Sequence, residues 1–584
     1  MNEKKNLQEM RHSLAHLLAA AVLELYPNAL PAIGPAIENG FYYDFEFVSP
    51  IGKDDLPKVE KKMREILKGW KGFSHHEVLE NEAKKIFKNN KYKLELIEEI
   101  AAKKEKITLY KSGDFEDLCR GGHVEDIKDL NPEAFVLSHT AGAYWRGSEK
   151  NKMLTRIYAL AFSTKQELDE YEAMLEEAKK RDHRILGEKL GLFMISDEVG
   201  KGLPLWLPNG AFVRKKLEDF IYEKESAHGY KYIYTPILTN KRLYEQSGHL
   251  THYREDMYSP IEIEGEEYYL RPMNCPHHHQ IFKHQPLSYR DLPLRLAEHG
   301  LVHRFERSGV LTGLIRARCF TQNDAHIYSA KSDLKKELLK VLKLFHEVYN
   351  DVFGIKDYWF RLSLPDFSNK EKFGDIENNA TWEEASKIAR ETLEEFGAKY
   401  VEGGGEAAFY GPKIDVQIKN VNGKEDTIAT IQIDFYSAKR FGLDFINADG
   451  QKEEPVIIHR AIMGSFERFF AFITEHYGGA FPLWLSPVQV KVITIGESHH
   501  AYGVKIFETL KEEGVKAELD LNNESLGKKI REAKIQKIPY LIVIGDKEVD
   551  SETLSVESRN EGNIGSLKIE DFISKIKKEI AEKK

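Results

Sequence analysis

A strongly charged segment with helical spacing, residues 165–189, separates two parts of the chain that both contain strand-like sequence. A chain of 584 residues is too long for one hydrophobic core, because a domain typically spans roughly 150 residues. We therefore predict a connecting helix over residues 166–188, solvated and without a site of its own. After Pro487, strand-like and helical runs alternate, which predicts a small mixed or parallel sheet. The expected fold is an α+β multidomain protein, divided into residues 1–165, 166–188, 189–484 and 485–584.

The composition excludes several classes of protein. Hydrophobic residues make up 41% and charged residues 31% of the chain, which is typical of a folded globular protein and not of a disordered or membrane protein. No apolar run approaches the roughly 20 residues that span a bilayer, and the N-terminal segment does not resemble a secretory signal. Three widely separated cysteines argue against a disulfide framework and predict a cytoplasmic location. The net charge of −9 neither indicates nor excludes nucleic-acid binding.

Two histidines and a later cysteine–histidine pair form a first candidate ligand set. His12 and His16 are four residues apart, on one face of a helix predicted over residues 7–26. Cys119 and His123 flank a glycine turn in the same predicted domain. These four side chains are a plausible ligand set for zinc. The spacing alone decides neither for a metal nor for a structural role, because histidine pairs on helices are often structural.

A second candidate set consists of Cys275, His326 and His459. Cys275 stands between prolines, in what we expect to be a rigid turn. Each of the three residues has an ordinary structural interpretation, and without a Cys-x2-Cys signature the spacing does not favour zinc. Three protein ligands would, however, leave a zinc ion a fourth position for a substrate, as catalytic sites do.

Motifs for nucleotide chemistry accompany this second set. Arg304-Phe305-Glu306 resembles the second signature motif of class II aminoacyl-tRNA synthetases, and Tyr234-Thr235-Pro236 and Gly464-Ser465-Phe466-Glu467-Arg468 resemble the first and third. The longer run that ends at His326 is similar to the threonyl-tRNA synthetase family. The N-terminal domain resembles the editing domain of bacterial members in Gly34-Pro35, in residues 38–45 and in residues 140–147.

The resemblance spans essentially the whole chain and implies both a fold and an activity. It implies an α+β editing domain, a class II catalytic core with an antiparallel sheet, and a C-terminal α/β anticodon-binding domain. The implied activity is that of a threonine–tRNA ligase, which forms threonyl-adenylate from ATP and L-threonine, transfers threonine to tRNA(Thr), and hydrolyses mischarged seryl-tRNA(Thr). The resemblance implies a homodimer that does not associate with a membrane. The small ubiquitin-like domain common in bacterial members is not expected, since the helix that carries His12 begins almost at Met1.

The resemblance also implies the site residues. The catalytic residues are Arg304, Lys413 and His249, and the ATP-binding residues are Arg304, Glu306, Arg316 and Arg468. Threonine is bound by Gln322, Asp324, Tyr410 and Gln432, and one Zn²⁺ per subunit by Cys275, His326 and His459, while Mg²⁺ accompanies ATP. Editing falls to His12, His16, Lys93, Asp117, Cys119 and His123, and anticodon reading to Glu548. Thr427 replaces a glutamine of some members, and Glu557 replaces a common arginine, which removes one expected anticodon contact.

Substrate chemistry connects the two candidate sets. An apolar pocket separates near-isosteres such as threonine and valine only about 10²-fold, whereas a zinc ion that must be ligated by a hydroxyl rejects valine. Serine keeps the hydroxyl and lacks one methyl, worth roughly 1–3 kcal/mol, so a second, hydrolytic site becomes necessary. Members of the family edit without a metal, whereas related alanyl-type deacylases hold zinc with the same residue pattern, and the sequence leaves both possibilities open.

Two other functions are less consistent with the sequence. A metal-dependent hydrolase centred on the first set would leave Arg304, Glu306 and Arg468 without a role. A non-catalytic RNA-binding paralogue would be expected to have lost ligands or phosphate-binding arginines, and this chain retains them. A row of basic residues between Lys528 and Lys537 on a predicted helix could follow tRNA phosphates or form a solvated face.

Overall fold

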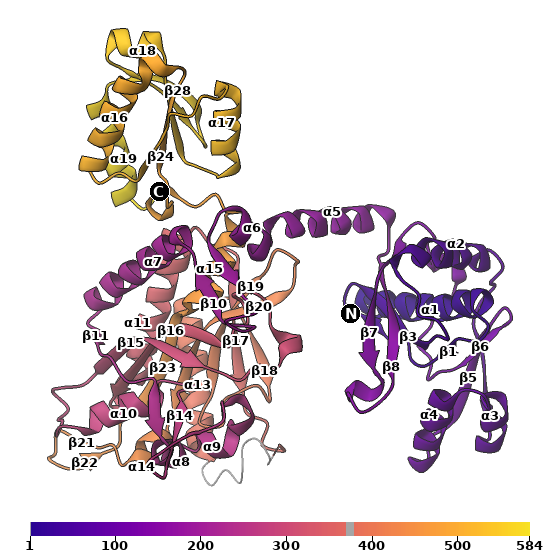
Figure 1. Cartoon of the computed structure of the whole chain (residues 1–584). Helices are drawn as coiled ribbons and strands as arrows, with labels where there is room; N and C mark the ends of the chain where they lie inside the picture. The colour runs from indigo at the N-terminus through magenta and orange to yellow at the C-terminus, as the bar shows by residue number, and fades with distance from the viewer. Residues whose placement is uncertain (1, 370–378) are drawn as a thin grey trace. The chain divides into compact units, whose positions relative to one another are not determined.

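The computed structural model describes residues 2–369 and 379–584. The chain folds into two compact units, residues 1–176 and 177–584 (Figure 1). Among the described residues, no helix combines the length and the apolar character that crossing a bilayer requires.

The first unit is built around α1 (Asn2–Leu25), which ends shortly before Pro27 because a residue that precedes proline disfavours helical backbone. Buried side chains of α1, among them Leu14 and Leu18, pack on α2 (Leu56–Leu67) and on one face of a sheet. The sheet has the order β1-β3-β8-β7, with β2 beside β3. Its strands are antiparallel and comprise β1 (Leu30–Pro31), β2 (Ala36–Ile37), β3 (Gly40–Glu46), β7 (Phe135–Tyr144) and β8 (Met153–Ala161).

A smaller antiparallel sheet completes the first unit. It contains β4 (Ser74–Val78), β5 (Ile107–Ser112) and β6 (Phe115–Leu118), and the intervening segment forms α3 (Glu80–Ile86) and α4 (Lys91–Ala102). The side chain of Asn90 caps α4 by accepting hydrogen bonds from the backbone of the first turn. Strand β6 leads directly to Cys119, and α4 carries Lys93, so this sheet and its helix supply one side of the candidate site around Cys119.

The connecting segment forms two helices, α5 (Lys165–Arg181) and α6 (His183–Lys189), and not the single predicted helix. Asp182 separates them, because its carboxylate accepts a hydrogen bond from the backbone N–H of Arg184 at 2.8 Å and so begins a new helix. The prediction of a solvated connector is wrong for α6, where His183 and Leu186 are buried. The charged residues beside His183 and Leu186 made the whole segment look solvent-exposed in the sequence.

The second unit contains an eight-stranded sheet with the order β11-β15-β16-β23-β20-β19-β17-β18. The six central strands are antiparallel, and only the two outermost pairs are parallel. The strands are β11 (Lys231–Tyr232), β15 (Leu294–His303), β16 (Cys319–Ser329), β17 (Tyr358–Leu364), β18 (Tyr400–Gly404), β19 (Lys413–Lys419), β20 (Glu425–Asp434) and β23 (Val456–Ser465).

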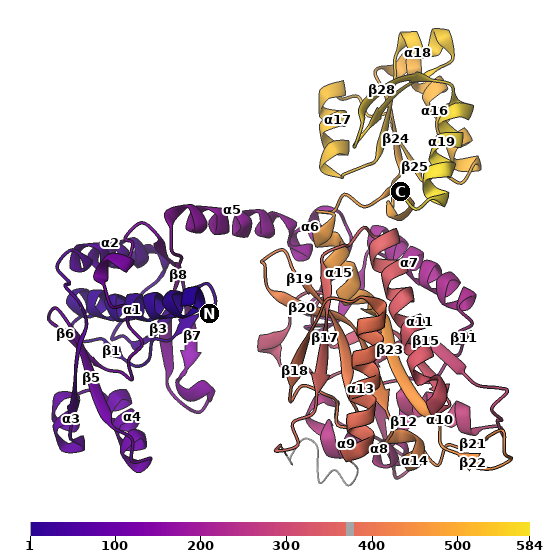
Figure 2. The ribbon, with the colours of Figure 1, turned by 180° about the vertical axis from the view of Figure 1, so that it is seen from behind.

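Helices α11 (Leu334–His346), α13 (Asn379–Phe396) and α15 (Phe466–His476) cover one face of this sheet (Figure 2). Leu338, Leu393 and Phe470 from these helices share a core with Ile431 and Ile458 from the strands. The opposite face is therefore left for a site. The remaining elements of this part are β9 (Phe193–Ile195), β10 (Pro204–Trp206), α7 (Pro208–Ala227), β12 (Leu238–Asn240), α8 (Lys241–Ser247), α9 (His249–His252), β13 (Ile261–Ile263), β14 (Glu266–Leu270), α10 (Cys275–Lys283), α14 (Ser437–Phe441), β21 (Phe445–Ile446) and β22 (Lys452–Glu453).

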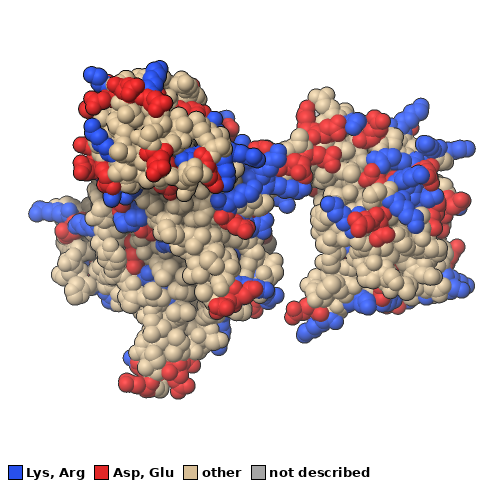
Figure 3. All heavy atoms as spheres, turned by 45° about the horizontal axis from the view of Figure 1, so that its top comes forward, with Lys and Arg blue, Asp and Glu red and all other residues tan. Residues whose placement is uncertain are grey.

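The C-terminal part of the second unit is a five-stranded mixed sheet with the order β25-β24-β26-β27-β28. Three strands are parallel, and β27 and β28 are antiparallel additions, so the alternating pattern after Pro487 correctly predicted a mixed sheet. Its elements are β24 (Val490–Thr494), α16 (His500–Glu512), β25 (Ala517–Asp520), α17 (Leu526–Ile535), β26 (Tyr540–Ile544), α18 (Asp546–Ser551), β27 (Leu554–Ser558), β28 (Gly562–Leu567) and α19 (Ile569–Ala581). On the face shown in Figure 3, acidic and basic side chains are interspersed over both units.

Candidate functional sites

The candidate site of the second unit is a row of side chains across the eight-stranded sheet. His326 on β16 faces His459 on β23, His459 faces Gln432 on β20, and Gln432 faces Lys413 on β19. Such cross-strand partners project on the same side of a sheet. Cys275 is the first residue of α10, and not part of the expected turn, and it brings its thiol to this row. Ligand atoms of Cys275, His326 and His459 lie within 4.8 Å of one another.

Buried partners orient the two histidines. The Nε2 atom of His459 lies 2.8 Å from Oδ2 of the fully buried Asp434. The Nδ1 atom of His326 lies 2.9 Å from Nδ1 of His278, whose Nε2 lies 3.2 Å from Oε2 of Glu298. One ring nitrogen of each cluster histidine is thereby engaged, which leaves the other available as a ligand. Metal-binding histidines typically have this arrangement.

The electrostatics of the donor set suit a divalent cation. Burial and the neighbouring histidines lower the pKa of His326 well below its usual value, so its free nitrogen carries a lone pair. Burial of Asp434 opposes its ionisation, but the hydrogen bonds from His459 and Ser437 outweigh this effect and lower its pKa. Burial, together with nearby carboxylates, raises the pKa of the Cys275 thiol well above its usual value. A cation at this point would favour the thiolate and compensate the carboxylate charge.

A cavity of about 680 Å³ opens onto this cluster and is lined by every predicted threonine-binding residue. The Nδ2 atom of Asn274 donates to Oδ2 of Asp324 at 3.0 Å, which fixes that carboxylate. The hydroxyl of Tyr410 donates to Oε1 of Gln432. The ammonium of Lys413 also lines the cavity and lies 2.6 Å from Asp415. The predicted residues lining the cavity are Cys275, Arg304, Gln322, Asp324, His326, Tyr410, Lys413, Gln432 and His459.

A second cavity of about 160 Å³ in this unit is lined by the four residues predicted to bind ATP. Arg304 lines both cavities, so it stands where they adjoin. The Nε atom of Arg316 donates to Oε2 of Glu306 at 3.0 Å, so these two predicted ligands are paired with each other. Arg468 donates to the backbone oxygens of Ile315 and Thr427, each at 3.2 Å. Thr427 is therefore part of the wall of this cavity.

Two of the residues predicted to act in the second unit lie outside these cavities. His249 is buried, with Nδ1 2.7 Å from Oγ of Ser247 and Nε2 3.0 Å from Sδ of Met273, and only Met273 of these three lines the larger cavity. Glu548 lies in the first turn of α18, where its carboxylate accepts a hydrogen bond from the backbone N–H of Gly545 at 3.0 Å. In their predicted roles, His249 and Glu548 would have to change conformation or act from outside the two cavities.

The predicted basic row on α17 is not a continuous surface. Lys529 is buried, and its ammonium donates to the backbone oxygens of Thr494 and Asp520 at 3.0 and 3.4 Å. Lys534 forms an ion pair of 2.7 Å with Glu557, the residue that departs from the family pattern. Lys529 therefore belongs neither to a phosphate-following row nor to a solvated face, the two alternatives that the sequence left open, because its inward position on the helix places its ammonium against backbone oxygens.

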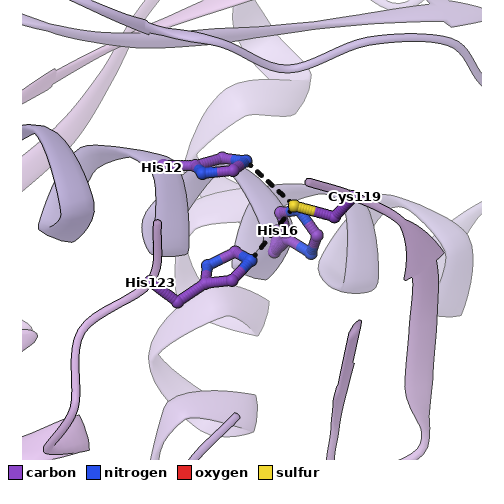
Figure 4. Close-up of side chains that lie close together, drawn as sticks. All are labelled: His12, His16, Cys119 and His123. Carbon is purple, nitrogen blue, oxygen red and sulfur yellow. Dashed lines mark hydrogen bonds between the residues drawn. The ribbon is translucent and has the colours of Figure 1, made fainter. Parts of the chain in front are cut away.

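The other candidate site lies in the first unit and is centred on Cys119 (Figure 4). Its thiol lies 3.6 Å from Nε2 of His12 and 3.4 Å from Nε2 of His123. Together with His16, these groups offer ligand atoms that lie within 4.8 Å of one another. The far nitrogen of His12 lies 3.3 Å from the backbone oxygen of Gly122, and that of His123 lies 3.2 Å from Oγ of Ser13. Backbone and hydroxyl groups, and not carboxylates, orient these rings.

A buried ion pair adjoins this cluster. The ammonium of Lys93 lies 2.6 Å from Oδ1 of Asp117, and both side chains are about 3% exposed. The hydroxyl of Tyr43 donates to Oδ2 of Asp117 at 2.6 Å and accepts from Lys93 at 3.2 Å. These three residues line a cavity of about 400 Å³ with His12, His16 and Cys119. His123 reaches this lining through its contact with Cys119.

In the site of the first unit, the side chains around the Cys119 thiol favour their uncharged forms. Burial lowers the pKa of His12, and burial together with the other histidines lowers the pKa of His123 to about 2. Burial raises the pKa of the Cys119 thiol to about 11. Neutral imidazoles and a thiol can hold and orient a water molecule by hydrogen bonds.

Comparisons with known proteins agree with this geometry. Three family models match separate segments: "tRNA synthetase class II core domain (G, H, P, S and T)" at residues 258–477, "Anticodon binding domain" at residues 489–579, and "Threonyl and Alanyl tRNA synthetase second additional domain" at residues 107–158. The threonine–tRNA ligase of Oceanobacillus iheyensis is 47% identical over 99% of this chain and 89% of its own length. The chain belongs to the threonine–tRNA ligase family.

Other members of the family agree with this assignment. The threonine–tRNA ligase of Geobacillus kaustophilus is 48% identical over 99% of this chain and 88% of its own. The crystal structure of the RNA binding domain of threonyl-tRNA synthetase from Cryptosporidium parvum Iowa II shares 35% identity, with a TM-score of 0.64 over 68% of this chain and 98% of that one. The expected class II core, editing domain and anticodon-binding domain of this family are thus confirmed.

Several buried residues of both sites escaped the sequence interpretation. Asp434 had a signal, because it lies two residues beyond Gln432 on a strand and so on the same face. Tyr43 alternates with two phenylalanines on β3, a pattern that predicts only a core position. His278 and Glu298 belong to different elements and meet only in the folded chain.

Proposed function

We propose that this chain is an ATP-dependent threonine–tRNA ligase whose two candidate sites make and check the same product. The observation that carries this proposal is the cluster of Cys275, His326 and His459 at the end of a cavity that Arg304 joins to the ATP-side cavity. An amino-acid side chain at the cluster and an α-phosphate at Arg304 would then belong to one substrate complex. The functional division we propose is editing over 1–165, a connector over 166–188, catalysis over 189–484 and anticodon binding over 485–584.

Zinc fits the cluster, because a thiol and two oriented imidazoles match its ligand preference and leave a position open. Bound there by Cys275, His326 and His459, it would select an amino acid that offers both an amino group and a side-chain hydroxyl. The protein's own side chains complete the selection: Asp324, held by Asn274, faces the same cavity.

The activation step needs positive charge at the α-phosphate. A carboxylate oxygen of threonine attacks the α-phosphorus, the bond to the bridging oxygen breaks, and pyrophosphate leaves. Arg304 stabilises the charge that develops on the α-phosphate, and Lys413 lies across the cavity for the transfer step. We assign adenine to Glu306 and Arg468 and the outer phosphates to Arg316, whose pairing with Glu306 would have to open, while Mg²⁺ is held mainly by the phosphates and water. His249 would act in the later transfer, in which a tRNA hydroxyl attacks the carbonyl and releases AMP.

The first unit would hydrolyse seryl-tRNA(Thr) with water oriented by neutral groups. His12, His16, Cys119 and His123 form the polar cluster, and Lys93 and Asp117 close the cavity. Water adds to the ester carbonyl, and the tRNA hydroxyl leaves with a proton. We propose that this site works without a metal, because His12 and His123 are oriented by Gly122 and Ser13 and not by carboxylates.

The remaining partners follow from the family. We propose a cytoplasmic homodimer, with its interface around Tyr234, whose side chain is 88% exposed next to the buried Thr235–Glu298 contact. tRNA(Thr) would bind through the C-terminal sheet, with Glu548 as a base reader. The ion pair between Lys534 and Glu557 would reduce the basic surface there.

Pyrophosphate exchange with ATP, measured with threonine, serine and valine, tests the proposal. Threonine should support exchange, serine should be lower by about 10- to 200-fold, and valine lower by about 10⁴-fold or more, since valine cannot supply the hydroxyl. An enzyme that exchanges with none of them, or equally with valine, would contradict the assignment.

A further inference from the structure

A buried histidine in the connector contacts the loop that lines the ATP-side cavity. His183 is the first residue of α6 and is 1% exposed. Its Nε2 atom lies 3.2 Å from the backbone nitrogen of Leu314. Leu314, Ile315 and Arg316 line the ATP-side cavity. The connector, which carried no predicted site, therefore contacts the nucleotide loop directly.

The hydrogen-bond pattern assigns the protonation of this imidazole. A backbone N–H can only donate, so Nε2 of His183 accepts from Leu314 and carries no hydrogen. The Nδ1 atom then carries the hydrogen and donates to Oε1 of Glu475 at 2.7 Å. The same carboxylate oxygen accepts from the backbone N–H of His183 at 3.2 Å. Glu475 thus holds the ring in the tautomer that the loop requires.

Glu475 and Arg468 lie on the same helix, α15, and hold neighbouring positions of the loop. Arg468 donates to the backbone oxygen of Ile315, while Glu475 reaches Leu314 through His183. The loop itself is tight, because Thr312 and Arg316 form a β-bridge around this point. Fixing Leu314 and Ile315 therefore also fixes the start of the Arg316 side chain.

The glycine before this contact shows how closely the two segments approach. Gly313 has a positive φ of 48°. A Cβ atom at this position would lie 2.3 Å from Nε2 of His183. A side chain at position 313 would clash with the His183 ring, and the positive φ also favours glycine there.

We propose that His183 is a positioning residue for the ATP-binding loop, holding Leu314 and Arg316 in place from the connector helix α6. This inference rests on the proposed ligase function and adds a residue that touches neither substrate. Arg316 needs the loop in one position to meet the outer phosphates, whereas the threonine cavity does not include the contacted residues Leu314 and Ile315. Loss of the contact between His183 and Leu314 should therefore raise the KM for ATP and leave the KM for threonine nearly unchanged.

Two substitutions separate the contact from the fold. In His183→Asn, the shorter amide can still donate to Glu475 but cannot reach Leu314. In His183→Gln, an amide oxygen can occupy the region of Nε2 and accept from Leu314. Ile185→Ala, at an exposed position of the same helix, is the matched control. Gly313→Ala approaches the contact from the other side, because its methyl group would push the loop away from His183.

Steady-state pyrophosphate exchange at varied ATP and varied threonine provides the readout. We expect His183→Asn and Gly313→Ala to raise the KM for ATP about tenfold and to leave the KM for threonine within about twofold, with His183→Gln recovering most of the loss and Ile185→Ala unchanged. Because both changes break one contact, the double variant should be less than additive.

Distinct results would overturn the proposal. An unchanged KM for ATP in a folded His183→Asn or in Gly313→Ala would do so. Equal effects of His183→Asn and His183→Gln on both substrates and on the melting temperature would reduce the residue to a general structural role. If His183→Asn does not fold, Gly313→Ala alone decides. Absence of exchange in the unsubstituted enzyme would instead contradict the proposed ligase function.

Discussion

The two histidine–cysteine clusters use the same side chains in different surroundings. In the second unit, the rings of His326 and His459 are held from behind by His278 and Asp434. In the first unit, the rings of His12 and His123 are held by a backbone carbonyl and a hydroxyl, and point their other nitrogens at the thiol of Cys119. A carboxylate behind an imidazole makes it a more basic ligand. We therefore propose that the partners behind the rings, and not the ligand types, distinguish a metal site from a water-orienting one.

The carboxylate nearest to each cluster makes the same point. Asp434 accepts directly from His459. Asp117 is instead paired with the ammonium of Lys93 and accepts a hydrogen bond from the hydroxyl of Tyr43. Asp434 therefore adds negative charge behind the ring of His459. The charge of Asp117 is compensated by the ammonium of Lys93.

The substitutions Cys119→Ala and His12→Ala should give the largest difference between the activities of the two sites. Each should reduce deacylation of seryl-tRNA(Thr) by about 10²- to 10⁴-fold, because the groups that orient the water and move its proton are lost. Pyrophosphate exchange with threonine should stay within about twofold of the unsubstituted enzyme, because the residues that line the ATP and threonine cavities belong to the second unit. Normal deacylation by both variants would show that the cluster is not the editing site.

The partner behind the ring is tested by Asp434→Asn. This change keeps the size of the side chain but removes the charge behind His459, and it should weaken zinc binding about 10- to 100-fold. Competition with a chelator measures the affinity. Asp117→Asn is the matched control, and its zinc affinity should equal that of the unsubstituted chain. Equal losses in both variants would remove the distinction between the two clusters.

A smaller effect is expected from Tyr43→Phe, which deletes the hydroxyl between Lys93 and Asp117 and leaves the ring. A hydrogen bond to a charged group contributes about 1.5–3 kcal/mol, and because the ion pair itself remains, we expect a loss of about tenfold in deacylation. Single-turnover hydrolysis of seryl-tRNA(Thr) gives the rate. A rate unchanged by the substitution would show that Tyr43 serves only the core.

The smallest effect concerns pH. His12 and His123 have pKa values below the usual 6.5, because burial disfavours their charged forms. His123, whose pKa is lowered to about 2, should stay neutral when the pH falls from about 7.5 to about 6, and His12 should be protonated less than an ordinary histidine. Deacylation should therefore change less than about twofold over this range once chemical hydrolysis is subtracted. A decline that follows a pKa near 6.5 would place a protonated histidine in the site.

The sequence predicted several of the elements and many of the polar residues that line the cavities, because their signals are local or belong to a family motif. His12 and His16 needed only helical spacing, and the mixed C-terminal sheet needed only alternation. Asp434, His278 and His183 could not be predicted in the same way, because each acts through a partner far away in the sequence. His183 was concealed further by the charged residues around it, which made a buried position look solvated. The misjudged Lys529 shows the same limit, since its partners are backbone oxygens.

Zinc content per chain tests the central distinction most directly. The full chain, Cys275→Ser and Cys119→Ser should be purified in parallel and their zinc measured by atomic emission after dialysis against buffer. The account predicts about one zinc per chain in the full chain and in Cys119→Ser, and close to none in Cys275→Ser. Retention of zinc in Cys275→Ser together with its loss in Cys119→Ser would place the metal at the other cluster and contradict the account.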